Sequence, residues 1–502
     1  MFRKVYGSQR GSSGGRTDLG IVMNIGEIFE NAPSLEIKSV MTDSRIKAED
    51  AIFFCLKGKI NDGHDFIEQA VSNGAICVVY SDEQSSYIPG VTYLMVNDTR
   101  EALNYFVTRF YGDPTRKMKV FGITGSNGKS TVAWIVSYLC SRFDKCGYIG
   151  NMEAAVDEVV TDISNVRHDT VFIHSMCRQM LDRDCKCVSV EVDSAALADG
   201  VFDKVDFDSV SFTNMKDSHL EYHGNFERYY NTKKKLFTMI GPEQKAIINI
   251  DEEEGINLLH DTTGTPVTYS LRQKADYMAC NIKLFSDHSE FEVIHGDKRY
   301  PVTSSLLAEF NVYNVLTALT ILAESGYPLD QLVEFCDSIP MIYGRMEGVK
   351  EGQPFNVIVD HTHTPEGFRT ILEFARGITG KNHRVFTVFG VSGGRDSKKK
   401  AEFGKVAAEY SDLIILTMQD PRNEDPEAIS DQIKAGILET NNLFIEERYS
   451  AISQACELAN PGDTVVILGK GNDQTMEISG VKQYWMGDSN AVRKIIREMN
   501  EV

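Results

Sequence analysis

Short apolar runs alternate with amphipathic, helix-like segments along the chain, and they fall into three successive blocks. The first block, 23–117, has short runs separated by turns and predicts a small α/β domain. The second block, 118–343, and the third, 344–502, contain strands that are apolar almost throughout. Such strands, separated by helices, are typical of parallel sheets covered on both faces. The pattern therefore predicts an α/β protein of three domains.

The same pattern places individual elements. Strands are expected at 51–56, 75–80, 91–96, 119–124, 187–192, 208–213, 245–250, 355–360, 383–390, 412–417 and 463–469. Helices are expected at 311–324, 366–378, 398–410, 426–439 and 448–459. The total of 502 residues agrees with three domains, because one domain commonly takes roughly 150 residues.

The first 22 residues differ from the rest because they are basic and rich in Gly and Ser. They lack the apolar core of a secretory signal, so we expect a flexible leader at 1–22, with Met23 as an alternative start. The whole chain is 42% hydrophobic and 25% charged, which is ordinary for a globular protein. No run approaches the roughly 18 apolar residues that a membrane span needs.

Charge and cysteine usage narrow the class of partner. The chain has 52 Lys and Arg against 72 Asp and Glu, a net charge of -20. A field of that sign opposes general binding to nucleic acids or anionic membranes, although a local basic pocket could still hold a small anion. The ten cysteines are scattered without a CxxC pair, which favours reduced thiols and a cytoplasmic protein.

The clearest chemical signal is the segment 120–139, in which an apolar strand leads through a glycine-rich turn into a helix. The glycines let backbone N–H groups approach phosphate oxygens, the helix N-terminus favours an anion, and Lys129 adds a charge. Ser130 or Thr131 can reach a magnesium ion. The turn predicts a nucleoside triphosphate site formed by Thr124, Gly125, Ser126, Asn127, Gly128, Lys129, Ser130 and Thr131.

A series of motifs around this turn resembles one family. The motifs are TDSR (42–45), DGHDFIEQA (62–70), TGSNGKST (124–131), FTNMKDSHLEYHG (212–224), KKKLF (233–237), FNVYN (310–314), GRMEG (344–348), VDHTHTP (359–365), QDPRNEDP (419–426) and GKGND (469–473). In this order they resemble the Mur ligases, the ATP-dependent enzymes that add amino acids to peptidoglycan precursors. Within that family the chain is most similar to the tripeptide synthetases, the MurE branch.

The resemblance implies an architecture and an activity. It implies a UDP-substrate-binding domain at 23–117, a P-loop ATPase-like parallel sheet at 118–343 and a Rossmann-like amino-acid-binding domain at 344–502. It further implies a cytoplasmic, monomeric ligase acting in cell wall biogenesis, cell shape and cell division. A carboxylate of UDP-N-acetylmuramoyl-L-alanyl-D-glutamate would attack ATP, and an amino acid would then displace phosphate from the acyl phosphate, with two magnesium ions offsetting charge.

The resemblance also assigns roles to single residues. Glu191, at the end of a predicted strand, would hold magnesium, and His219 would hold a second ion, with His223 as the competing candidate. Lys233 would carry a carbamate that acts as an oxygen ligand. The nucleotide would further contact Asn311, Asn314, Arg345 and Asp360, while the UDP-substrate would contact Asp43, Ser44, Arg45 and Asn165.

The amino-acid end of the reaction is left open between two substrates. The relatives that add meso-diaminopimelate carry Asp-Asn-Pro-Arg, where this chain has Gln419-Asp420-Pro421-Arg422. Arg422 and Arg395 could bind carboxylates, whereas Asp420 could pair with a lysine ammonium group. Together with Gly469 and Asp473 of GKGND, these residues slightly favour L-lysine over meso-diaminopimelate.

The acceptor end departs most from the family pattern. Val166-Arg167-His168 stands where relatives have Thr-Thr-Pro, and Asp193, Asp199 and Val201 replace a Ser, a Gln and an Arg that contact the acceptor in relatives. Two alternatives to an ordinary tripeptide synthetase therefore stay open. One is a MurE-like paralogue that ligates an amino acid to another carboxylate substrate, and the other is a non-catalytic binding subunit on the same scaffold.

Overall fold

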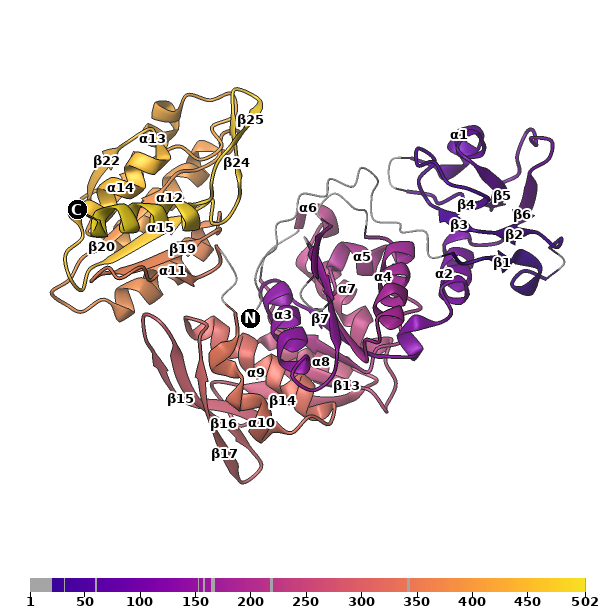
Figure 1. Cartoon of the computed structure of the whole chain (residues 1–502), viewed down its shortest axis with the longest axis horizontal. Helices are drawn as coiled ribbons and strands as arrows, with labels where there is room; N and C mark the ends of the chain where they lie inside the picture. The colour runs from indigo at the N-terminus through magenta and orange to yellow at the C-terminus, as the bar shows by residue number, and fades with distance from the viewer. Residues whose placement is uncertain are drawn as a thin grey trace. The chain divides into compact units, whose positions relative to one another are not determined.

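The structure is a computed structural model that describes residues 20–501 except 31, 59–60, 152, 157–158, 164–167, 217–219 and 341–343 (Figure 1). Of the leader expected at 1–22, all but 20–22 lie outside these residues. The chain divides into two compact units. The first comprises Met1–Met278, His295–Asp297 and Asn314–Leu332, and the second comprises Ala279–Ile294, Lys298–Tyr313 and Val333–Val502. The three predicted domain boundaries stay a prediction.

The first unit begins with a small α/β layer. A parallel four-stranded sheet has the order β3 (Ser39–Met41), β4 (Ala51–Phe54), β5 (Ala75–Tyr80) and β6 (Thr92–Met95). It is accompanied by α1 (Ile67–Ser72), α2 (Thr99–Phe110) and the short pair β1 (Met23–Asn24) and β2 (Glu36–Ile37). Asp98 caps α2 by accepting hydrogen bonds from the N–H groups of Arg100 and Glu101. Leu103, Phe106 and Val107 of α2 then pack into the core of this layer.

The second layer of this unit is a larger sheet of mainly parallel strands. These strands lie in the order β8 (Cys146–Ile149), β11 (Cys187–Glu191), β7 (Lys119–Thr124), β12 (Ser209–Phe212), β13 (Lys245–Asn249) and β14 (Thr265–Ser270). Antiparallel β9 (Glu153–Val156) and β10 (Val159–Asp162) extend one edge. The helices are α3 (Lys129–Cys140), α4 (Thr170–Asp182), α5 (Ser194–Ala198), α6 (Leu220–His223), α7 (Phe226–Thr238) and α8 (Glu253–Asp261).

Next along the chain comes β15 (Tyr277–Leu284), which pairs in parallel with β14 through Tyr277 and Met278. It is followed by β16 (Ser289–His295), β17 (Lys298–Ser304), α9 (Glu309–Glu324) and α10 (Leu329–Glu334). The second unit then contains a six-stranded sheet. Its order is β18 (Glu347–Gly348), β19 (Asn356–Asp360), β23 (Thr464–Leu468), β20 (Val385–Phe389), β21 (Leu413–Leu416) and β22 (Asn441–Phe444). All pairs in it are parallel except β18 with β19.

Alternate residues of this sheet face two different apolar cores. Val385 and Phe389 of β20 pack in one core, and Phe386 and Val388 pack in the other. The covering helices are α11 (Pro365–Ile378), α12 (Ser397–Tyr410), α13 (Pro426–Lys434), α14 (Arg448–Leu458) and α15 (Asp488–Asn500), with a hairpin of β24 (Thr475–Ile478) and β25 (Val481–Tyr484). This arrangement confirms the predicted α/β class with parallel, doubly wound sheets.

The predicted elements are present, and most of their ends shift by no more than two residues. The exception is the helix expected at 426–439, because α13 ends at Lys434. Just after α13 the chain packs closely on α12, because a Cβ at Gly436 would lie 1.8 Å from the carbonyl oxygen of Ala401. No helix among the described residues is long and apolar enough to span a membrane.

Candidate active site

The glycine-rich turn joins β7 to α3 and is held firmly by its neighbours. A Cβ at Gly125 would lie 1.9 Å from Oγ1 of Thr213, and a Cβ at Gly128 would lie 2.5 Å from Oδ1 of Asn314. Gly128 also has a φ of 85°, which disfavours a side chain. Asn127 donates its N–H to Asn214 Oδ1 at 2.9 Å. These close contacts fix the loop, and the N-terminus of α3 follows it directly.

Lys129, Ser130 and Glu191 come together beside this turn. Glu191 lies at the end of β11, which pairs with β7, so its carboxylate reaches the start of α3. Ser130 donates its hydroxyl to Glu191 Oε2 at 2.6 Å, and Lys129 Nζ lies 3.8 Å from Glu191 Oε1. A hydroxyl and a carboxylate are oxygen donors of the kind that Mg²⁺ prefers. The predicted magnesium ligands Ser130 and Glu191 therefore fit the ion.

Lys233 on α7 is the most unusual group near the turn. Its side chain is 1% exposed, and Nζ donates to the carbonyl oxygen of Gly125 at 2.7 Å. The ammonium also lies 4.6 Å from the ring centre of Tyr229. Burial, and next the charge of Lys129, lower the pKa of Lys233 from 10.5 to about 7. A large part of this amine is thus uncharged at neutral pH, and an uncharged amine is a nucleophile.

Two predicted residues of this region fall on parts the structure does not describe. His219 and Asn165 lie outside the described residues, as do Val166 and Arg167. The competing candidate His223 is described, is buried, and lies with Nε2 3.0 Å from the hydroxyl oxygen of Ser194. The structure therefore gives His223 a partner inside the protein and leaves the assignment of His219 a prediction.

The other predicted nucleotide contacts have defined surroundings. Asn314 of α9 lies against Gly128 of the turn, because a Cβ at Gly128 would lie 2.5 Å from the side-chain oxygen of Asn314. Asn311, one turn earlier on the same helix, donates its side-chain amide to the carbonyl oxygen of Leu307 at 2.8 Å. In the second unit Asp360 is buried at the end of β19 and accepts N–H bonds from Met346 and Thr362. Burial raises the pKa of Asp360. The two N–H bonds and the charge of the exposed Arg345 act in the opposite direction but do not cancel the effect of burial.

The predicted UDP-substrate residues lie just after β3. Arg45 is bound to Asp43 through two side-chain hydrogen bonds of 2.9 and 2.6 Å, and the arginine side chain is 79% exposed. Ser44 is buried and donates to Oε1 of Gln69 at 2.6 Å. These three residues thus form a local turn, with Arg45 directed to solvent.

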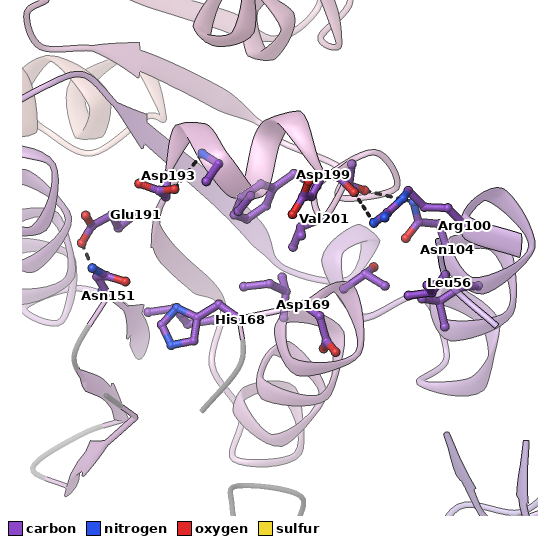
Figure 2. Close-up of a pocket in the computed structure, with 18 of the residues that line it drawn as sticks. Leu56, Arg100, Asn104, Asn151, His168, Asp169, Glu191, Asp193, Asp199 and Val201 are labelled. Carbon is purple, nitrogen blue, oxygen red and sulfur yellow. Dashed lines mark hydrogen bonds between the residues drawn. The ribbon is translucent and has the colours of Figure 1, made fainter. Parts of the chain in front are cut away.

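Four described positions that depart from the family pattern line one cavity of about 330 Å³ (Figure 2). His168, Asp193, Asp199 and Val201 all lie on its wall, together with Glu191. Asp193 accepts the N–H of Ala195 at 2.7 Å and so caps α5. Asp193 therefore stabilises the N-terminus of α5, as a Ser at this position would also do.

The predicted amino-acid residues gather around a strained turn after β21. Asp420 and Arg422 have φ values of 44° and 57°, which are unusual for residues with side chains. A Cβ at Gly469 would lie 2.1 Å from Oε1 of Gln419, so the GKGND loop packs directly on this turn. The carbonyl oxygen of Pro421 likewise lies 2.1 Å from a Cβ placed at Gly393.

A buried lysine determines what Asp420 can do. Lys470 is 1% exposed, and its Nζ lies 2.9 Å from Oδ2 of Asp420 and 2.6 Å from Oδ2 of Asp473. Asp420 also accepts the N–H of Glu477 at 2.8 Å. Burial alone raises the pKa of Asp473, but the hydrogen bond and charge of Lys470 outweigh it, so the net pKa is lowered. The ammonium partner that the sequence predicted for Asp420 is thus supplied by the protein, and this does not support a preference for free lysine.

The two predicted arginines lie on adjoining loops. Arg395 donates to the carbonyl oxygen of His363 at 2.7 Å, and Arg422 is 52% exposed with Glu477 at 3.5 Å. A Cβ at Gly394 would lie 3.4 Å from Nη1 of Arg422. Burial and then the charge of Arg422 lower the pKa of Arg395. The turn therefore combines an internally neutralised lysine with two neighbouring guanidinium groups.

Sequence patterns missed several residues of these sites. Lys470 was part of a recognised motif, but its two carboxylate partners could not be read from spacing. Arg100 and Asn104 line the cavity from α2. They belong to no motif, and only the packing of α2 near α5 brings them there.

Comparisons with known proteins agree on one family. The chain matches the models for the Mur ligase family catalytic domain at residues 36–111, the Mur ligase middle domain at 123–322 and the Mur ligase glutamate ligase domain at 344–471. It is 34% identical to the UDP-N-acetylmuramoyl-L-alanyl-D-glutamate--2,6-diaminopimelate ligase of Caldanaerobacter subterraneus, over 93% of this chain and 96% of that protein. The enzyme of the same name from Geobacillus kaustophilus is also 34% identical, over 92% and 95%.

A solved structure extends this likeness. A UDP-N-acetylmuramoyl-L-alanyl-D-glutamate--2,6-diaminopimelate ligase superposes with a TM-score of 0.76 at 26% identity, covering 96% of this chain and all (100%) of that one. The MurF ligase of Thermotoga maritima, solved with ADP, shares the fold with a TM-score of 0.62 at 17% identity, over 92% of this chain and 98% of that one.

Proposed function

The chain belongs to the Mur ligase family, and on that premise we propose that it joins 2,6-diaminopimelate to UDP-N-acetylmuramoyl-L-alanyl-D-glutamate at the expense of ATP. The observation that carries the proposal is the meeting of Lys129, Ser130, Glu191 and Lys233 around the glycine-rich turn. The names of the relatives support the acceptor and the diamino acid.

The chain's own residues support an acyl-phosphate route. Backbone N–H groups of the turn and Lys129 hold the phosphates of ATP, so that a carboxylate oxygen of the acceptor can attack the γ-phosphorus and release ADP. The amine then attacks the acyl carbonyl, phosphate leaves, and the new amide nitrogen loses its proton. Ser130 and Glu191 would hold Mg²⁺, which offsets negative charge on the phosphates when bound. His219, Asn311, Asn314, Arg345 and Asp360 stay proposed contacts of metal or nucleotide.

The lowered pKa of Lys233 supports its proposed carbamate. Carbamate formation requires a neutral amine, because the nitrogen lone pair attacks the carbon of CO₂ and one N–H proton then leaves. With a pKa of about 7, Lys233 meets this requirement at neutral pH, whereas an ordinary lysine does not. The product is an anion close to Lys129 and Glu191, where it would serve as an oxygen ligand.

We further propose that the amino-acid site selects diaminopimelate over lysine. Asp420 and Asp473 are committed to Lys470, whereas Arg395 and Arg422 repel each other. A distal carboxylate would relieve that repulsion through charge-assisted hydrogen bonds, and lysine has no such group.

The test is phosphate release from ATP with UDP-N-acetylmuramoyl-L-alanyl-D-glutamate as acceptor, measured with meso-diaminopimelate, with L-lysine and without amine. We expect release with diaminopimelate and at most slow release with lysine. Release with lysine alone would contradict the choice of amino acid. No release with either amine, from folded protein that binds ATP, would reject the acceptor and revive the paralogue hypothesis.

A variant sharpens the choice of amino acid. Arg422→Gln keeps a hydrogen-bonding side chain but removes the charge, so it should raise KM for diaminopimelate by about 10- to 100-fold, the loss expected for one charge-assisted contact. The KM for ATP should stay unchanged. Arg369→Gln is a matched control, because Arg369 pairs with Glu409 elsewhere on the second unit. Equal effects of the two substitutions would refute the assignment of Arg422.

A further inference from the structure

The cavity of Figure 2 connects the phosphate end of the site to helix α2. Glu191 and Asn151 lie at one end of the view, and Arg100, Asn104 and Leu56 lie at the other. The acceptor carboxylate that becomes phosphorylated has to reach the Glu191 end, where Lys129 and Ser130 lie. Whatever else the acceptor carries on its terminal residue extends away from that end.

Most acidic groups on the cavity wall already have partners within the protein. Asp169 caps α4 through the N–H of Phe172 and also accepts the hydroxyl of Thr42 at 2.6 Å. Asp193 caps α5, and Glu191 accepts from Ser130 and from the N–H of Asn151. These hydrogen bonds fix the carboxylates in place but do not remove their negative charge, so an anionic group in this cavity needs a nearby positive charge.

Arg100 is different from these groups because most of its donors are unused. Among the described residues that line the cavity, it is the only lysine or arginine. Its Nη1 donates to the carbonyl oxygen of Asp199 at 2.6 Å, and within the described chain its other guanidinium donors have no partner. Since a guanidinium has five N–H donors in a planar fork, Arg100 can hold an oxyanion while it keeps this bond.

Val201 lies on the same wall as Asp199, so the cavity offers no second arginine from that segment. The bond from Arg100 to Asp199 and the bond from Asn104 to the carbonyl oxygen of Gly200, at 3.0 Å, tie α2 to the segment after α5. Because these bonds position the guanidinium against the cavity, its orientation is set before any ligand arrives. Pre-ordering of this kind lowers the entropic cost of binding.

We propose that Arg100 binds a non-reacting oxyanion of the acceptor and thereby orients the reacting carboxylate toward the phosphate end. This proposal rests on the proposed function. The acceptor offers two such groups, the second carboxylate of its terminal glutamate and its diphosphate. Arg100 is thus a specificity-determining residue for the acceptor, supplied by the N-terminal α/β layer.

The test compares Arg100→Met, Arg100→Lys and Asn104→Ala in the full-length protein. Steady-state KM values for acceptor and ATP are measured with acceptors ending in D-glutamate or in D-isoglutamine, whose second carboxylate is an amide. We expect Arg100→Met to raise KM for the glutamate acceptor by about 10- to 100-fold, with an unchanged KM for ATP. Arg100→Lys should recover part of the loss, because it keeps the charge but not the fork.

The Asn104→Ala variant distinguishes acceptor binding by α2 from mere attachment of α2 to the segment after α5. It removes a bond to the adjacent carbonyl group without removing a charge, so the rise in KM for the acceptor should be about tenfold smaller than that of Arg100→Met. A thermal unfolding scan of each variant shows whether α2 stays attached. Equal increases for Asn104→Ala and Arg100→Met, or increases in both KM values, would overturn the proposal in favour of a purely structural latch.

The two acceptors identify the oxyanion. If Arg100 binds the carboxylate, the unaltered protein prefers the glutamate acceptor and Arg100→Met loses that preference. If it binds the diphosphate, Arg100→Met weakens both acceptors equally. An unchanged KM for both acceptors in Arg100→Met rejects the proposal alone, whereas absence of turnover and of calorimetric acceptor binding in the unaltered protein rejects the proposed function.

Discussion

Lys233 in the first unit and Lys470 in the second are both 1% exposed, yet their surroundings are opposite. The ammonium of Lys233 meets the carbonyl oxygen of Gly125 and the face of Tyr229, and no described carboxylate pairs with it directly. The ammonium of Lys470 lies between the carboxylates of Asp420 and Asp473. Lys233 is therefore buried without a directly paired carboxylate, whereas Lys470 is buried between two carboxylates that more than balance its charge.

The difference shows that burial alone does not predict chemistry. Desolvation without a directly paired carboxylate, and next the charge of Lys129, lower the pKa of Lys233 to about 7, which leaves much of this amine uncharged. Desolvation with two counter-ions produces a structural cation that holds a turn in place. The following experiments test whether the two lysines differ in this way and measure by how much.

The largest expected effect is on activity. Lys233→Ala should lower the rate of phosphate release by at least about 10³-fold, because it removes the group that would carry the anionic ligand beside Lys129 and Glu191. Acetate or propionate should restore part of the rate by supplying a carboxylate in the space left. Lys234→Ala is the control, since Lys234 of α7 pairs with Asp261 at the end of α8, and this variant should retain nearly full activity.

Full activity of Lys233→Ala without any added acid would show that the carbamate is unnecessary. Loss of activity without rescue, in a variant that still binds ATP, would instead limit Lys233 to holding the turn through Gly125.

The second effect is on stability. Lys470→Met should lower the free energy of unfolding by about 3–5 kcal/mol, because it leaves two partly buried carboxylates without their cation. The additional change Asp420→Asn should recover part of that loss by removing one of the charges. Urea unfolding of the single and double variants measures both values. An unaltered midpoint in the single variant would contradict the role given to Lys470.

The smallest effect, counted per pH unit, is on the pH dependence of stability. The folded pKa of Lys233, about 7, lies below its ordinary value of 10.5, so between these values the unfolded chain binds a proton that the folded chain lacks. Stability should therefore fall as pH falls from about 10 to 7, by at most about 1.4 kcal/mol per pH unit from this group. Lys233→Met should lack this slope. Urea midpoints at several pH values in CO₂-free buffer, with Lys234→Met as control, test this difference.

How far the sequence predicts each region depends on how local its determinants are. The phosphate turn follows from consecutive residues at the end of one strand, so Gly125 to Thr131 could be identified directly. The state of Asp420 depends on Lys470, which lies 50 positions later, and no spacing rule joins them. Arg100 reaches the cavity only because α2 packs near residues 199–200. The fold class was predictable because alternating apolar strands and helices are also local patterns.

The left-handed backbone at Asp420 limits what a sequence difference at this position says about the amino-acid substrate of related ligases. Asn and Asp tolerate that conformation better than most residues with side chains, so exchange between them is permitted whatever the ligand. Here the extra charge of Asp is absorbed by Lys470. A lineage could therefore drift from Asn to Asp at this position, with a compensating lysine in place, and keep the same amino-acid substrate. A change from Asn to Asp in this motif is therefore better evidence of common ancestry than of a change in the amino-acid substrate.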